Sequence, residues 1–128
     1  MLKIREFEFD FDISAPEDLE RYLHSCKAME ERERNAPSMP VDRTSPQYLA
    51  DYLAWLKAYC KLLTDWIDDV LGEGACNKLL GAKTSLSELL DLWDEIEAAA
   101  TAQGEAIGRH VQKYTPNRAT RRKAKAGK

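Results

Sequence analysis

Two groups of acidic side chains have a spacing that could hold a divalent cation. They are Asp65, Asp68 and Asp69 in the first group and Asp91, Asp94 and Glu95 in the second. Each group has the i, i+3, i+4 spacing that places carboxylates on one face of a helix, and carboxylate oxygens are ligands of Ca²⁺ and Mg²⁺. Apolar residues lie between these acids, as is typical of an amphipathic helix with a solvated acidic face. We therefore expect the acids at the surface, and we expect no metal and no other cofactor.

The residues that carry nucleophilic or acid–base chemistry do not form a catalytic pattern. The two histidines, His24 and His110, have no cysteine at a metal-ligand spacing and belong to no Ser/His/Asp order. The glycine-containing segment 72–74 is too short and too acidic to bind a phosphate. The three cysteines form no CxxC pair, which is typical of reduced thiols in a cytosolic protein. The sequence therefore indicates that the protein is not an enzyme.

Aromatic side chains are the strongest candidates for a partner-binding site. Tyr48, Tyr52 and Trp66 follow the apolar face of one long predicted helix, and most of this face is expected to be core. Trp55 lies off that face, and Trp93 belongs to the last predicted helix. Large aromatic residues outside a core are enriched where proteins bind partners. We expect Trp55 and Trp93 to be exposed, and all five residues are candidates for partner binding.

The C-terminal end of the chain has a charge opposite to that of the rest. Residues 115–128 carry six basic residues and no acid, a charge of +6, whereas residues 1–114 carry a charge of −9. Arg118, Arg121 and Arg122 could contact phosphates or an acidic protein. The segment has no aromatic residue to stack on bases, so its composition favours a disordered tail or a protein contact over nucleic acid.

The hydrophobic pattern predicts a mainly α protein with a short N-terminal β-hairpin. Apolar residues alternate in residues 1–13 and change phase at residues 5–6, which indicates two strands joined by a tight turn, with a β-bulge as the alternative. Three main helices follow, and capping boxes at Ser14 and Ser85 mark the start of the first and the last. The second opens at residues 45–46, after a loop at 35–46. Residues 72–83 form a turn with room for one short helix.

The last helix is expected to weaken beyond its alanine run. Gly104 and Gly108 interrupt the pattern there, and residues 115–117 end it. The chain of 128 residues thus divides into one helical domain, residues 1–114, and a basic flexible tail, residues 115–128. No apolar run is long enough to cross a membrane, and the acidic N-terminus does not resemble an export signal. We expect a soluble cytoplasmic protein.

Three short motifs are similar to those of a known family. They are the aspartate-rich stretch that runs into Gly-Glu-Gly at residues 65–74, the Leu-Gly pair at 80–81, and residues 114–122. With these motifs the chain resembles a family of small phage and prophage proteins from tail-gene clusters of viruses that infect Gram-positive bacteria. The chain departs from the family pattern at Trp66, Ile67 and Leu71, where phenylalanine is expected.

The resemblance implies a tail assembly chaperone. Such a protein binds the long, helical and aggregation-prone tape-measure protein in the host cytoplasm, keeps it soluble, and helps to recruit tail-tube subunits. On this interpretation the aromatic candidates contact the client, and the three arginines of the tail provide a second contact. The partners would be the tape-measure protein and the tail-tube protein.

Two other functions agree with the same sequence. The first is a nucleic-acid-binding phage regulator that acts through the basic tail. The second is a structural component of the virion, in which the hairpin adds to the sheet of a neighbouring subunit. A homo-oligomer is compatible with each function, because three helices and a hairpin leave apolar surface uncovered.

Overall fold

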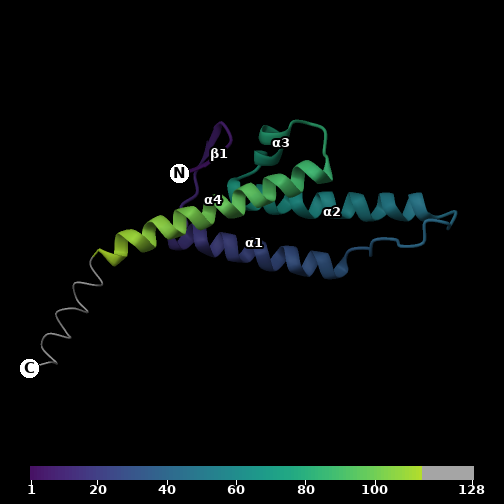
Figure 1. Ribbon diagram of the computed structural model, residues 1–128, viewed down its shortest axis with the longest axis horizontal. Coiled ribbons are helices and arrows are strands. Elements are labelled where there is room, and N and C mark those ends of the chain that lie inside the picture. The colour runs from purple at the N-terminus through teal and green to yellow at the C-terminus, as the bar shows by residue number, and fades with distance from the viewer. Residues whose placement is uncertain (114–128) are drawn as a thin grey trace, which may run out of the picture.

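The computed structural model describes residues 1–113 and is mainly helical, with a small N-terminal hairpin (Figure 1). The elements in chain order are β1 (Leu2–Ile4), β2 (Phe7–Phe9), α1 (Pro16–Asn35), α2 (Tyr48–Leu71), α3 (Ala75–Leu80) and α4 (Leu86–Gln112). The predicted fold class is therefore confirmed: three long helices and an N-terminal hairpin. The short helix α3 lies in residues 72–83, the segment predicted as a turn with room for one short helix. The predicted tail lies outside the described residues.

The hairpin forms because its two strands place their apolar residues on the same side. Leu2 pairs with Phe9 and Ile4 pairs with Phe7 in antiparallel register. Arg5 adopts a left-handed conformation with φ of 57°, which makes the tight turn that the change of phase predicts. An isolated two-stranded sheet is marginal in water, and this one is stabilised by packing of β1 on α4.

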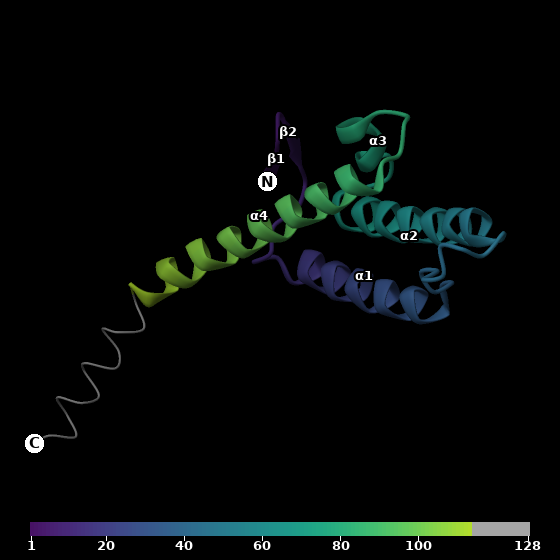
Figure 2. The same ribbon diagram turned by 45° about the vertical axis from the view of Figure 1, so that its right-hand side comes forward.

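The three long helices enclose one core. α1 and α2 pack side by side in antiparallel directions, and α4 lies against the C-terminal half of α2 (Figures 1 and 2). The largest fully buried side chains come from α2, α4 and the segment after β2; they are Trp66, Phe11, Leu63, Ile67, Leu89, Leu92, Ile96 and Val70. The core therefore occupies the region where α2, α4 and the hairpin meet.

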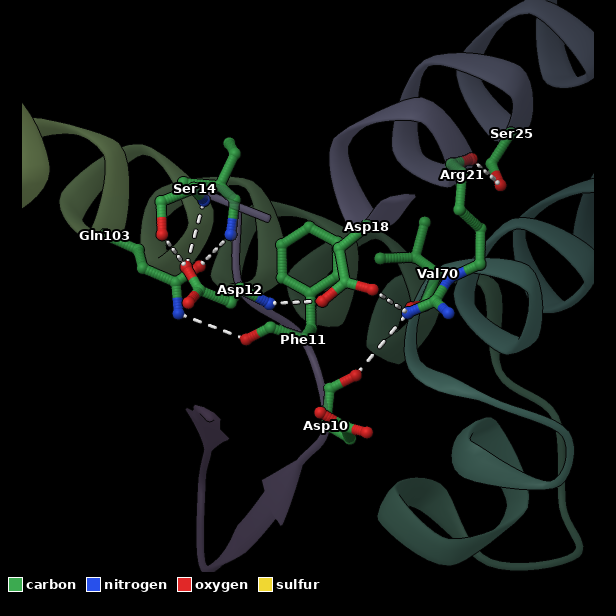
Figure 3. A network of polar contacts seen from close by, with 10 residues as sticks. Asp10, Phe11, Asp12, Ser14, Asp18, Arg21, Ser25, Val70 and Gln103 are labelled. Atoms are coloured by element: carbon green, nitrogen blue, oxygen red, sulfur yellow. Dashed lines mark hydrogen bonds and ion pairs between the residues drawn. The ribbon is translucent and has the colours of Figure 1, made fainter. Parts of the chain in front are cut away.

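A polar network holds the segment between the hairpin and α1 (Figure 3). Gln103 accepts a hydrogen bond from the backbone N–H of Ile13 at 2.7 Å and donates one to the carbonyl of Phe11 at 3.1 Å. Asp18 accepts the backbone N–H of Asp12 at 2.8 Å. The network satisfies backbone groups that belong to no strand or helix, so it fixes this segment between α4 and α1.

Arg21 links the same region to α2. Its guanidinium donates to the carbonyl of Val70 at 3.2 Å and to the carbonyl of Asp10 at 3.5 Å (Figure 3). The carbonyl of Val70 lies in the last turn of α2, where carbonyls have no partner within the helix. A cation is favourable at this end of a helix because the dipole is negative there.

The predicted capping boxes are wrong. The Ser14 hydroxyl donates to Asp12 at 2.6 Å and makes no cap for α1, whose N-cap is Ala15. Ser85 is the N-cap of α4, but its side chain makes no capping hydrogen bond. The second long helix begins at Tyr48 rather than at residues 45–46, because Ser45 and Gln47 form a turn before it. At Ser14 and Ser45, local turns therefore compete with helix capping for the hydroxyl.

The predicted interruption of the last helix is also wrong. α4 continues through Gly104 and Gly108 to Gln112. Neither glycine has a positive φ, and a Cβ built on Gly104 would lie 3.7 Å from Ile13, an ordinary van der Waals distance. A glycine costs a helix about 1 kcal/mol relative to alanine, which the good helix formers around these two can offset.

Candidate partner-binding site

The apolar face of α2 is buried at one end of the helix and uncovered at the other. Trp66 and Ile67 are fully buried in the core. Tyr48 and Leu49 precede them by eighteen residues, which is five turns of 3.6 residues, so they occupy the same angular positions on the helix. Leu49 is nevertheless 76% exposed, and Tyr48 is half-buried. The same face therefore changes from core to surface along α2.

The next turn of the helix repeats this relation. Val70 and Leu71 are buried, whereas Tyr52 and Leu53 lie eighteen residues earlier at the same angles. Leu53 is 49% exposed and Tyr52 is half-buried. The cause is the position of α4: the N-terminal end of α2 extends beyond the start of α4 in both views (Figures 1 and 2). No described element takes the place of α4 there.

Four aromatic rings form a continuous row on this uncovered half of α2, which we call the aromatic stripe. Its members are Tyr48, Tyr52, Trp55 and Tyr59. Successive ring centroids lie 6.1, 5.7 and 5.3 Å apart, so each ring contacts the next. Such contacts restrict the rotamers of these side chains before a partner binds, so less conformational entropy is lost on binding. The structure therefore brings together three of the predicted site residues, Tyr48, Tyr52 and Trp55.

The inner end of the stripe is tied to α1. The Tyr59 hydroxyl donates to a carboxylate oxygen of Glu33 at 3.3 Å. Burial raises the pKa of Tyr59, and the negative charge of Glu33 raises it further. The phenol therefore stays protonated, and it acts as a hydrogen-bond donor at the border between the stripe and the core.

Trp66 is a core residue, and its role in partner binding stays a prediction. It is 1% exposed and contacts Tyr22 and Trp93 in edge-to-face arrangements, with centroids 5.8 and 6.2 Å apart. Two expectations are wrong: Trp55 lies on the same face as Tyr52 and Tyr59 rather than off it, and Trp55 and Trp93 are half-buried against neighbouring rings rather than exposed. Aromatic contacts within and between the helices shield these large rings.

A pocket of about 290 Å³ lies where the stripe meets the core, and we call it the tryptophan pocket. Residues of α1, α2 and α4 line it: Cys26, Met29, Glu30, Glu33, Trp66, Trp93 and Glu97. The indole N–H groups of Trp66 and Trp93 are shielded from solvent and have no acceptor among the described residues. Sequence reasoning missed this pocket, because its acids come from two helices whose relation no local pattern gives.

The predicted acidic groups take part in contacts with cations and backbone groups. Arg32 lies 3.9 Å from Asp65 and 3.8 Å from Asp69, and Asp68 accepts the backbone N–H of Cys76 at 2.9 Å. Within residues 1–113, no three histidine, cysteine or acidic side chains lie close enough together to hold a metal ion. In the same range no helix is long and apolar enough to span a membrane. The predicted contacts Arg118, Arg121 and Arg122 lie outside the described residues.

Comparison with known proteins identifies the family of the chain. Residues 5–125 match the model of DUF6673, a family of unknown function, and the chain belongs to this family. No curated protein and no solved structure matches the chain.

Proposed function

We propose that the protein is a phage or prophage tail assembly chaperone that binds a helical segment of the tape-measure protein. The observation that carries the proposal is the change of α2 from core to surface on one continuous face. In the buried half this face packs against another helix, α4. A client helix that continues the path of α4 would cover the exposed half, including Leu49 and Leu53, by the same kind of helix packing.

The chemistry of the face suits a client that is bound and later released. Tyrosine rings offer a large apolar area to a helix, and their hydroxyls can remain hydrated when no client is present. The aromatic stripe therefore tolerates exposure better than a row of leucines would. The surrounding chain has a charge of −9 over residues 1–114, which opposes aggregation of the complex in the host cytoplasm.

The test is co-expression with the tape-measure protein of the same phage or prophage. The soluble fraction of the client is measured, and the complex is isolated by size-exclusion chromatography. We expect a complex that persists at high salt and after nuclease treatment. Trp55→Ala and Leu53→Ala should each weaken it about tenfold or more, because they truncate large apolar side chains at the centre of the contact.

The matched control is Ile107→Ala, which removes an aliphatic side chain that is 40% exposed near the far end of α4. This variant should bind the client as well as the wild type does. The proposal is wrong if no complex forms, or if the complex depends on nucleic acid. A purified virion that contains the protein in stoichiometric amount would favour the structural alternative instead.

A further inference from the structure

We propose that the tryptophan pocket binds a lysine or arginine side chain of the client helix, so that the chaperone selects helices with a basic residue beside an apolar row. This inference rests on the proposed function and adds the chemical class of the client. It follows from three features of the pocket: unpaired carboxylates, an aromatic floor with unsatisfied donors, and a fixed distance from the aromatic stripe.

The carboxylates around the pocket have no cation to neutralise them. Within residues 1–113, Glu30, Glu33 and Glu97 form no ion pair. Arg34 lines a neighbouring hollow with Glu30 and Glu33 but forms no ion pair with either. Glu33 accepts the Tyr59 hydroxyl, a neutral donor. Three negative charges around one pocket favour a positive occupant.

The floor of the pocket suits the long stem of a basic side chain. The methylene groups can pack on an apolar surface formed by Cys26, Met29 and the rings of Trp66 and Trp93. Indole faces also attract the charged group through cation–π interaction. The carboxylates would repel an acidic side chain. A purely aliphatic side chain would desolvate them without providing a partner.

The two indole N–H groups make the closed pocket unfavourable. Each buried donor without an acceptor costs free energy, so a small outward movement of the half-buried Trp93 ring is made easier. An opened pocket would expose both donors to the occupant. A carbonyl in the last turn of the client helix, where carbonyls have no partner within the helix, can then accept from an indole N–H.

The distance between the stripe and the pocket sets the spacing on the client. Trp55 and Trp66 are eleven residues apart on α2, a rise of about 16 Å. A client helix that lies along α2 therefore contacts Trp55 with an apolar row and presents the basic residue about three turns away. The client pattern is an amphipathic helix with lysine or arginine near one end of its apolar face.

The experiment uses two helical peptides with the same apolar row. One peptide carries a lysine at each end of the row, about three turns from its centre. The other carries glutamine at the same two positions. The full-length protein is titrated with each peptide at low salt, and the indole N–H signals are followed by NMR. The three tryptophans serve as separate reporters: Trp55 for the stripe, and Trp66 and Trp93 for the pocket.

We expect the lysine peptide to bind about fivefold more tightly than the glutamine peptide. Both peptides should shift the Trp55 signal, and only the lysine peptide should shift those of Trp66 and Trp93. The double variant Glu30→Gln, Glu97→Gln should abolish the difference in affinity. The control Glu17→Gln, Glu20→Gln makes the same change of charge on exposed residues of α1 outside the pocket and should preserve it.

The outcomes separate the two proposals. Equal affinities together with a shift of Trp55 would overturn the basic-residue inference and leave the proposed function intact. No shift of Trp55 with either peptide would contradict the proposed function itself. A synthetic peptide of residues 114–128 provides the remaining arm. If it shifts the Trp66 and Trp93 signals at a lower concentration than the lysine peptide does, the occupant is the protein's own basic tail, and the inference is overturned.

Discussion

Gln103 shows how much one side chain contributes to the arrangement of the elements. Its amide makes hydrogen bonds to the backbone of Ile13, Phe11 and Met1, all about ninety or more positions away in the sequence. These backbone groups have few alternative hydrogen-bond partners, because they lie outside the strands and helices, before β1 or between the hairpin and α1. The residue therefore joins the N-terminal segment to α4.

Gln103→Ala is expected to lower the free energy of unfolding by about 1 to 3 kcal/mol, because it leaves buried or half-buried backbone groups without partners. Urea denaturation measures the change. Gln112→Ala makes the same substitution at an exposed position on the same helix and should change stability little. A loss for Gln103→Ala no larger than that of the control would show that water replaces the amide.

Tyr22 makes stability depend on pH in the alkaline range. Burial raises the pKa of Tyr22 from 10.0 to about 12. The unfolded chain then loses this proton at lower pH than the folded protein does, so the free energy of unfolding is unaffected below about pH 10 and falls between about pH 10 and about pH 12. Solvent screening of the half-exposed side chain limits the loss to about 1 kcal/mol.

Tyr22→Phe is expected to reduce this fall, because phenylalanine does not ionise. Urea midpoints of the two proteins, measured from about pH 9 to about pH 12, give the difference. Tyr59 also has a raised pKa, so the variant should keep part of the pH dependence. Parallel pH profiles for the two proteins would mean that Tyr22 ionises as readily in the folded state as in the unfolded chain.

The glycines of the helical region have two different roles at the level of the elements. Gly104 lies in the interior of α4 with ordinary helical geometry and room for a methyl group. Gly81, the C-cap of α3, has φ of 81°, a conformation that residues with a side chain rarely adopt. The first glycine is therefore replaceable, and the second is not.

Gly104→Ala should raise the free energy of unfolding by about 0.5 to 1 kcal/mol, because alanine has less freedom to lose in the unfolded chain. Gly81→Ala should lower it by about 1 kcal/mol through strain in the left-handed region. Thermal melts test both predictions: the melting temperature should rise for Gly104→Ala and fall for Gly81→Ala. The interpretation fails if Gly104→Ala destabilises the protein, since that would reveal a contact too tight for a methyl group.

The elements could be predicted from the sequence better than their ends. The change of phase at residues 5–6 gives the hairpin, and the long apolar face gives α2, because both patterns are local. The cap at Ser14 could not be predicted, since the Ser14 hydroxyl donates to Asp12 in a local turn, whereas Ser85 is the predicted N-cap residue of α4 but makes no capping hydrogen bond. The continuity of α4 through Gly104 and Gly108 was missed, because the helix formers around them offset the cost of each glycine.

The candidate site could be predicted in part. The sequence gives the residue types of the aromatic stripe and their place on one helix. It does not give which of them are buried, because this depends on where α4 begins along α2. Trp66 and Tyr48 occupy the same angle on the helix, yet only Trp66 is covered. The tryptophan pocket depends on the same tertiary relation.

The whole molecule has two ends of different character. At one end, α4, the hairpin and α2 enclose the core; at the other, the N-terminal end of α2 extends beyond the start of α4 (Figures 1 and 2). A molecule of this shape can accept a helix at its open end without rearrangement of its core. The proposed chaperone function needs this property, since a client must enter and leave while the protein remains folded.

Amide hydrogen exchange of the protein, alone and bound to the tape-measure protein, tests this claim most directly. We expect the N-terminal half of α2, residues 48–60, to exchange quickly in the free protein and to gain protection in the complex. The core half of α2 should be protected in both states. Protection confined to the hairpin or to α4, with residues 48–60 unchanged, would contradict the assignment of the uncovered face of α2 as the client-binding site.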